Sequence, residues 1–93
     1  MDSFDRVAYS LTNDSFNARR YADLLRRYWF SREATFLQLA NEWNVTKQRV
    51  DQVNKRMIRL LRLERSKDPD HFQRLFAGLR VPEQLDRETY PTT

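Results

Sequence analysis

The 93-residue sequence contains no cysteine, one glycine, one histidine and three prolines, none of them before residue 69. Without cysteine the chain can form neither a disulfide framework nor a thiolate zinc site, and one histidine cannot form a metal cluster alone. The scarcity of glycine and proline leaves little of the turn chemistry on which β-hairpins depend. The sequence therefore predicts an all-α fold with no metal and no cofactor.

Long hydrophobic runs are also absent. No apolar stretch reaches the roughly 18 residues that a transmembrane helix needs, and the N-terminal segment MDSFDRVAYS lacks a signal-peptide pattern. We therefore expect a cytoplasmic protein that does not contact a membrane. A chain of this length buries about 60–65% of its unfolded surface, so we expect a small bundle of four to five helices over residues 1–82 and a flexible tail over residues 83–93.

The strongest pattern in the sequence lies at about residues 35–64 and predicts a helix-turn-helix. A first helix is indicated by apolar residues at i, i+3, i+4 and i+7, namely Phe36, Leu39, Ala40 and Trp43. Asn44 tolerates the left-handed conformation that the turn requires, and Thr46 is a good N-cap for a second helix. The second helix has its own apolar stripe, which consists of Val50, Val53, Met57, Leu60 and Leu61.

Positive charge is concentrated on the predicted second helix. Between Lys47 and Lys67 there are eight basic and two acidic residues, a local charge of +6 against +4 for the whole chain. Opposite the stripe, this helix carries the polar residues Gln48, Asp51, Gln52, Lys55 and Arg59. Gln and Lys are side chains that contact base edges in the major groove of DNA. The alternative is an ordinary amphipathic helix whose basic face is only solvated.

The central segment resembles a known family. Val45-Thr46-Lys47-Gln48-Arg49-Val50, followed by Gln52-Val53, is similar to region 4 of bacterial sigma factors, which recognises the upstream promoter element. The resemblance covers about residues 18–63, including the string Leu24-Leu25-Arg26-Arg27-Tyr28 in the preceding helix. The resemblance implies a DNA-binding helix-turn-helix. The chain has no sequence for promoter melting or for clamping core polymerase, so we expect an isolated module and no complete sigma factor.

The resemblance also implies roles for single residues. Lys47, Gln48 and Gln52 match positions that touch base edges, and Arg49 matches a backbone contact. Gln48 replaces the usual Glu of principal sigma factors, and because Gln prefers adenine the target sequence should differ. Asp51 stands where Arg is common, which leaves open either a cytosine contact or a role in binding protein.

The predicted DNA interface therefore has two sets of residues. The base contacts are Lys47, Gln48, Asp51 and Gln52. The phosphate contacts are Thr46, Arg49, Lys55 and Arg59. We expect double-stranded DNA as the partner and a transcription regulator as the function, with the small size and isolated motif pointing to a phage or mobile element.

A protein-binding module that mimics region 4 is the alternative function. Leu63 lies in line with Arg56 and Arg59, away from the apolar stripe, and Phe72 and Phe76 lie on one face of a following helix. These three residues are a possible surface for RNA polymerase or a sigma factor, since region 4 also docks on a flap of the polymerase β subunit. The two phenylalanines fold back on the bundle in the other interpretation. The sequence leaves open whether the protein is a monomer or a homodimer.

Further charged residues lie outside the predicted helix-turn-helix, and each group has two interpretations. Asp68, Asp70 and His71 are interpreted as capping residues, because neither a nucleophile nor a phosphate-binding loop accompanies them, and we expect no enzyme. The pairs Arg19-Arg20 and Arg26-Arg27 either reach phosphates from the flank of the helix-turn-helix or lie on the surface with their alkyl stems covered.

Overall fold

The computed structural model describes residues 2–81 and Leu85, and these residues form helices and no strands. The elements in chain order are α1 (Ser3–Leu11), α2 (Ser15–Asp23), the π-helix η1 (Leu24–Phe30), α3 (Phe36–Trp43), α4 (Lys47–Lys67) and α5 (Pro69–Leu75). The predicted all-α fold with a helix-turn-helix is confirmed, because α3 and α4 are joined by a three-residue turn.

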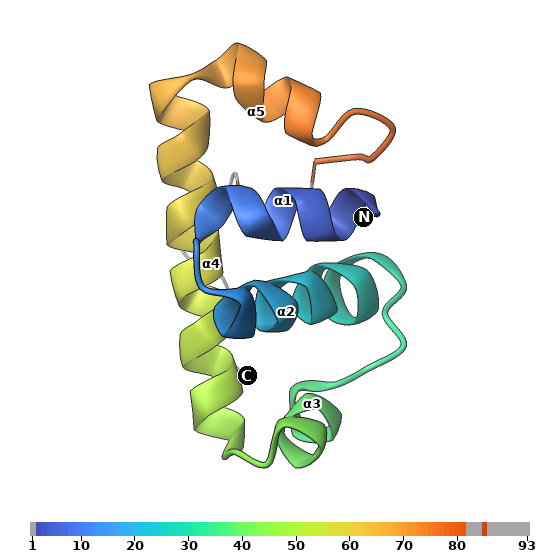
Figure 1. Cartoon of the computed structure of the whole chain (residues 1–93). Coiled ribbons are helices and arrows are strands. Elements are labelled where there is room, and N and C mark those ends of the chain that lie inside the picture. Colours follow the sequence, from blue (N-terminus) through green and yellow to red (C-terminus); the bar gives the residue numbers. More distant parts are fainter. Residues whose placement is uncertain (1, 82–84, 86–93) are drawn as a thin grey trace.

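The other helices are arranged around α4, the longest element at 21 residues. Figure 1 shows α4 along one side of the molecule, with α1, α2 and α5 lying across it and α3 beside its N-terminal end. Helices α1 and α2 lie next to each other and both contact α4. This arrangement leaves one long side of α4 facing away from the bundle.

Side chains accept backbone hydrogen bonds at the start of each α-helix, and they set where these helices begin. The capping residues are Asp2, Asp14, Thr35, Thr46 and Asp68. At α3 the cap is reciprocal: Gln38 N donates to Thr35 Oγ1 at 3.2 Å, and Thr35 N donates to Gln38 Oε1 at 2.8 Å. Each such cap contributes about 1 kcal/mol to helix stability.

Helix α2 continues directly into η1, and the winding of the chain changes at Leu24. Residues Leu24–Phe30 form a π-helix, in which Ser31 N donates to Arg26 O at 2.9 Å. Trp29 is buried, and its Nε1 donates to Asn54 Oδ1 of α4 at 2.8 Å. Tyr28 stacks on Phe36 with ring centroids 4.4 Å apart. The π-helix therefore connects to both helices of the helix-turn-helix.

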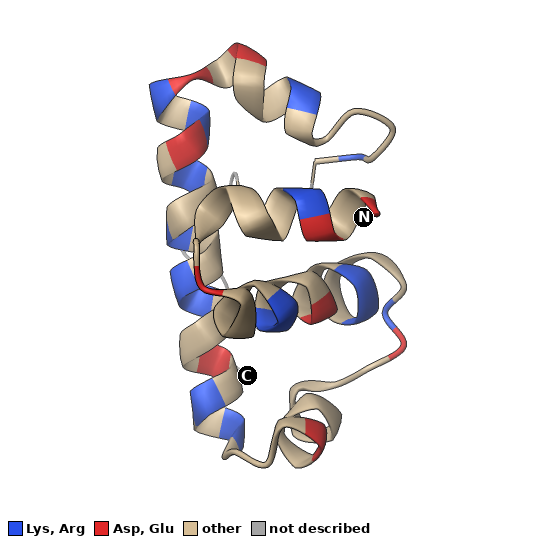
Figure 2. Cartoon of the chain, viewed as in Figure 1, with Lys and Arg blue, Asp and Glu red and all other residues tan. Residues whose placement is uncertain are grey.

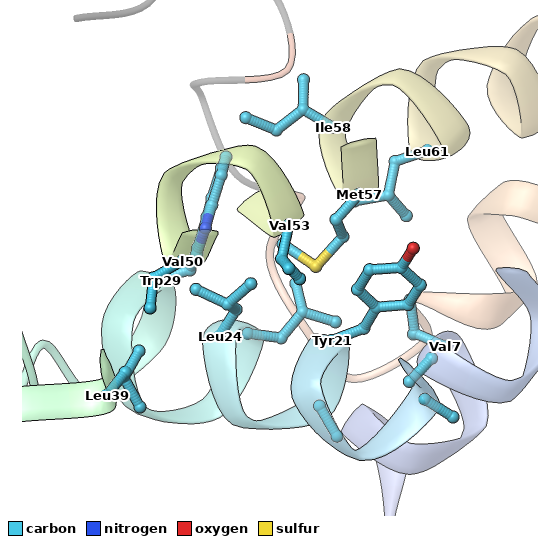
Figure 3. Close-up of a cluster of buried hydrophobic side chains, with 14 of the residues drawn as sticks. Val7, Tyr21, Leu24, Trp29, Leu39, Val50, Val53, Met57, Ile58 and Leu61 are labelled. Atoms are coloured by element: carbon cyan, nitrogen blue, oxygen red, sulfur yellow. The ribbon is translucent and has the colours of Figure 1, made fainter. Parts of the chain in front are cut away.

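The core lies between α4 and the helices that cross it. In Figure 3, Tyr21 of α2 and Leu24 of η1 lie among Val53, Met57 and other apolar side chains of α4. Of the apolar stripe predicted on α4, all members but Leu60 are buried, and Leu60 is partly buried. Asn54 and Ile58 are buried as well, so the buried face of α4 is wider than the stripe indicated.

Of the two interpretations of Phe72 and Phe76, the one in which they fold back on the bundle is confirmed, and the partner surface is wrong for both residues. They are only 2% and 3% exposed, and their ring centroids lie 4.9 Å apart in the core cluster. Their burial follows from α5 folding back against α4 and α1. Leu85 is also buried, and its carbonyl accepts a hydrogen bond from Arg62 Nε at 2.9 Å, so the packed core includes a residue past the boundary placed at 82. The remainder of the tail predicted at 83–93 lies outside the described residues.

Candidate nucleic-acid interface

The turn between α3 and α4 has the geometry that the sequence predicted. Asn44 adopts the left-handed conformation, with φ 60° and ψ 47°. Asn44 N donates to Asn41 O at 3.3 Å, and Val45 N donates to Ala40 O at 2.9 Å, which is the pair of bonds of a Schellman motif. Val45 packs against the core. These contacts fix the direction in which α4 leaves the turn.

The first turn of α4 is exposed. Thr46 caps it by accepting a hydrogen bond from Arg49 N at 3.1 Å. Lys47, Gln48 and Arg49, which follow the cap, are all exposed to solvent. The unpaired backbone N–H groups of a helix N-terminus and three long polar side chains thus project together from this end of α4.

Along α4, an exposed polar face runs opposite the core. Its members at intervals of four, four and three residues are Gln48, Gln52, Arg56 and Arg59. These intervals place the side chains on one side of a helix, and we call this set the polar face of α4. Figure 2 shows basic residues repeated along the helix. Arg56 also lies on this face and was not predicted as a contact, although its spacing of four residues from Gln52 was a signal for it.

The structure does not support Asp51 as a base contact. Its side chain is only 15% exposed, and its Oδ2 lies 3.0 Å from Lys55 Nζ one turn later. The other oxygen, Oδ1, is buried without a hydrogen-bond partner. Asp51 precedes the buried Asn54 by three residues, so it lies at the edge of the buried face. The same ion pair reduces the charge that Lys55 can offer to a phosphate.

The other predicted contacts are accessible. Arg59 is exposed on the polar face, and Thr46 retains its hydroxyl proton for donation because it only accepts in its cap. Arg49 Nη1 donates to Gln52 Oε1 at 3.3 Å. This hydrogen bond links a predicted phosphate contact to a predicted base contact, so the position of one side chain constrains the other.

The arginine pair Arg26-Arg27 is used in contacts within the bundle. Arg26 Nη2 lies 2.6 Å from Asp2 Oδ2, and Arg27 forms a two-pronged bond to Glu42 at 2.6 and 2.7 Å. The hydrogen bond to Glu42 raises the pKa of Arg27, and the same bond lowers the pKa of Glu42. These arginines hold η1 against α1 and α3, and the interpretation in which they reach phosphates is therefore not favoured.

The pair Arg19-Arg20 has different surroundings. Among the ion pairs of residues 2–81 and Leu85, none includes Arg19 or Arg20. The guanidinium of Arg20 lies 4.2 Å from the ring centroid of Phe16 and 5.2 Å from that of Trp43. Partial burial lowers the pKa of Arg20, and the positive charge of Arg49 lowers it further. The spacing of Phe16 and Arg20, four residues apart, was the signal in the sequence for this contact.

A groove opens beside Lys47 in the first turn of α4. It has a volume of about 620 Å³ and is lined by Tyr28, Arg32, Ala34, Thr35, Phe36, Leu37 and Lys47. Leu37 is 58% exposed and was not identified from the sequence. Further along α4, Leu63 is 48% exposed, as the predicted partner surface requires.

Within residues 2–81 and Leu85, no helix combines the length and the apolar character needed to cross a membrane. Comparisons of the chain with protein-family models, with curated proteins and with solved structures found no match. The similarity to region 4 of sigma factors therefore stays a prediction from the residues quoted above.

Proposed function

We propose that the protein is a sequence-specific, double-stranded DNA-binding transcription regulator that places α4 in the major groove. The observation that carries this proposal is the polar face of α4, which is exposed along three turns directly behind a well-formed helix-turn-helix turn. The major groove of B-DNA, about 12 Å wide, accepts an α-helix. The bundle supports α4 from its opposite side, so the helix enters the groove without rearrangement of the core.

The exposed residues divide into two groups by chemistry. Gln48 and Gln52 present amides, which form paired hydrogen bonds to the N6 and N7 of adenine, and Lys47 donates to guanine acceptors. Arg49, Arg56, Arg59 and Thr46 donate to phosphate oxygens, and these contacts set the register of the protein on the duplex. Lys55 adds less than its charge suggests, because Asp51 neutralises part of it.

The similarity of residues 45–53 to sigma region 4 supports the same proposal and indicates the kind of DNA target. A region 4-like module recognises a promoter element, so the regulated process would be transcription initiation. Gln48 in place of Glu indicates an adenine-containing target that differs from that of the principal sigma factors.

Selection of bound sequences from a random duplex pool tests this function. We expect one enriched motif with wild-type protein, and a single motif or an inverted repeat would distinguish a monomer from a homodimer on DNA. The double variant Gln48→Ala/Gln52→Ala should bind with about 1–3 kcal/mol less discrimination between the motif and its scrambled version. Both glutamines are exposed, so the variant should stay folded. Unchanged discrimination would reject these base contacts.

A protein-binding module that mimics region 4 is the second candidate. It is favoured by the exposed Leu63 and by the groove beside Leu37, since apolar side chains at a surface are typical of protein contacts. The partner would be RNA polymerase or a sigma factor. Retention of the protein on purified polymerase, lost on Leu63→Ser or Leu37→Ser, combined with no salt-sensitive binding to duplex DNA, would select this function over the first.

A further inference from the structure

Arg19 and Arg20 line a hollow beside Trp43, and the positive charge of Arg49, in the first turn of α4, acts on Arg20. No ion pair within residues 2–81 and Leu85 includes any of these three arginines. Asp23 also lines this hollow, but its carboxylate is engaged elsewhere. Its Oδ2 accepts a hydrogen bond from Trp43 Nε1 at 3.3 Å, and its Oδ1 lies 3.8 Å from Arg26 Nη1. Like charges held close to one another raise the energy of the free protein, and an anion between them lowers it.

Arg20 is held in place by two aromatic rings. Its guanidinium lies over the ring of Phe16, on its own helix, and over the ring of Trp43, the last residue of α3. Contacts with ring faces leave the N–H groups at the edge of the guanidinium free to donate, and they reduce the conformational freedom lost on binding. Phe16 is 60% exposed, which is unusual for a phenylalanine and is explained if its ring serves to position Arg20.

The hollow beside Arg20 is open and small. It has a volume of about 200 Å³ and is lined by Phe16, Arg19, Arg20, Asp23 and Trp43. The positive charge of Arg49 lowers the pKa of Arg20, and Arg49 is itself hydrogen-bonded to Gln52 of the polar face. A group bound here would therefore lie next to the residues proposed to contact bases.

We propose that Arg20 and Arg49 together bind one phosphate of the DNA backbone, with Phe16 and Trp43 as positioning residues for Arg20. This inference rests on the proposed function, because the phosphate belongs to the duplex whose major groove receives α4. It adds a contact from α2 that lies outside the helix-turn-helix. Through the Arg49–Gln52 hydrogen bond, the phosphate also fixes the register in which Gln52 meets its base.

The salt dependence of binding measures this contact. On the selected duplex, log Kobs falls with log salt by about 0.9 for each phosphate that is neutralised. Arg20→Gln should make this slope shallower by about 0.9. The matched control is Arg74→Gln, which removes the same charge from an exposed site on α5, and it should leave the slope unchanged. Arg20→Lys keeps the charge but loses the two-pronged geometry, so it should keep the slope and bind more weakly.

Single neutral methylphosphonates along each strand would locate the phosphate. At the position of the proposed phosphate, a methylphosphonate should weaken the binding of wild-type protein and should not weaken the binding of Arg20→Gln any further. Circular dichroism melting of each variant shows whether it is folded. The phosphate site is rejected if folded Arg20→Gln has the wild-type salt slope and loses affinity at every methylphosphonate that weakens wild-type binding. Specific DNA binding would stand in that case. If wild-type protein binds no duplex in a salt-dependent way, the proposed function fails, and the site with it.

Discussion

The two faces of α4 differ in what they contact. The face toward α1, α2 and α3 carries Val50, Val53, Met57 and Leu61. The face away from the bundle carries Gln48, Gln52, Arg56 and Arg59. The first set is buried among apolar side chains, whereas the second set makes few contacts within the protein. Stability and binding therefore depend on different residues of the same helix, so substitutions can separate them.

The largest effect is expected on the buried face. Met57→Ala removes a side chain that is fully buried at the centre of the core, and it should lower the free energy of unfolding by about 2–5 kcal/mol. Urea denaturation measures this change. Leu63→Ala, on the exposed side of the same helix, is the control and should change stability by less than about 0.5 kcal/mol. Equal losses in the two variants would contradict the assignment of the faces.

A smaller effect, on the salt dependence of DNA binding, is expected at the edge between the faces, where Asp51 and Lys55 form their ion pair. Arg59 on the polar face is the comparison, and Arg59→Ala should make the salt slope shallower by about 0.9. Lys55→Ala should change it by less, because its charge is already partly neutralised at 3.0 Å by Asp51. Asp51→Asn should increase affinity for all duplexes, since it frees Lys55 for a phosphate. If Lys55→Ala and Arg59→Ala had equal effects, the ion pair would not persist in solution.

The smallest effect is expected on the pH dependence of stability, from the ion pair between Arg27 and Glu42, which lies outside both faces of α4. The bond from Arg27 lowers the pKa of Glu42 below its ordinary value of 4.5. A carboxyl group whose pKa is lowered on folding adds stability above its ordinary pKa, and this stability is lost as the pH falls through the lowered value. The midpoint of urea denaturation should therefore decrease on the acid side of 4.5, and slightly less steeply in Glu42→Gln. A steeper decrease in the variant would contradict the role given to this pair.

The sequence predicted the local features of the helix-turn-helix correctly because each depends on neighbouring residues. Asn44 and Thr46 have intrinsic preferences for a left-handed turn and for an N-cap, and both occupy those conformations. The exposure of Lys47, Gln48 and Gln52 followed from helical spacing alone.

Features that depend on distant parts of the chain were not predicted. Spacing could not show that Asp51 lies beside the wider buried face that includes Asn54. The amphipathic pattern of α5 fitted either a free surface or a packed helix, and its phenylalanines are buried. No proline or glycine marked the π-helix. The surroundings of Arg20 include Trp43 and Arg49 from two other helices, so only the fold could distinguish this arginine from Arg26.

Amide chemical-shift mapping shows whether the polar face of α4 enters the duplex. Titration of isotope-labelled protein with the selected duplex should perturb the backbone amides of residues 46–59 on the polar face and the side-chain amides of Gln48 and Gln52. Residues of α5 at the far end of the molecule should remain unchanged. Perturbations confined to the surroundings of Leu63 and the groove at Leu37, with the two glutamine amides unaffected, would contradict the account.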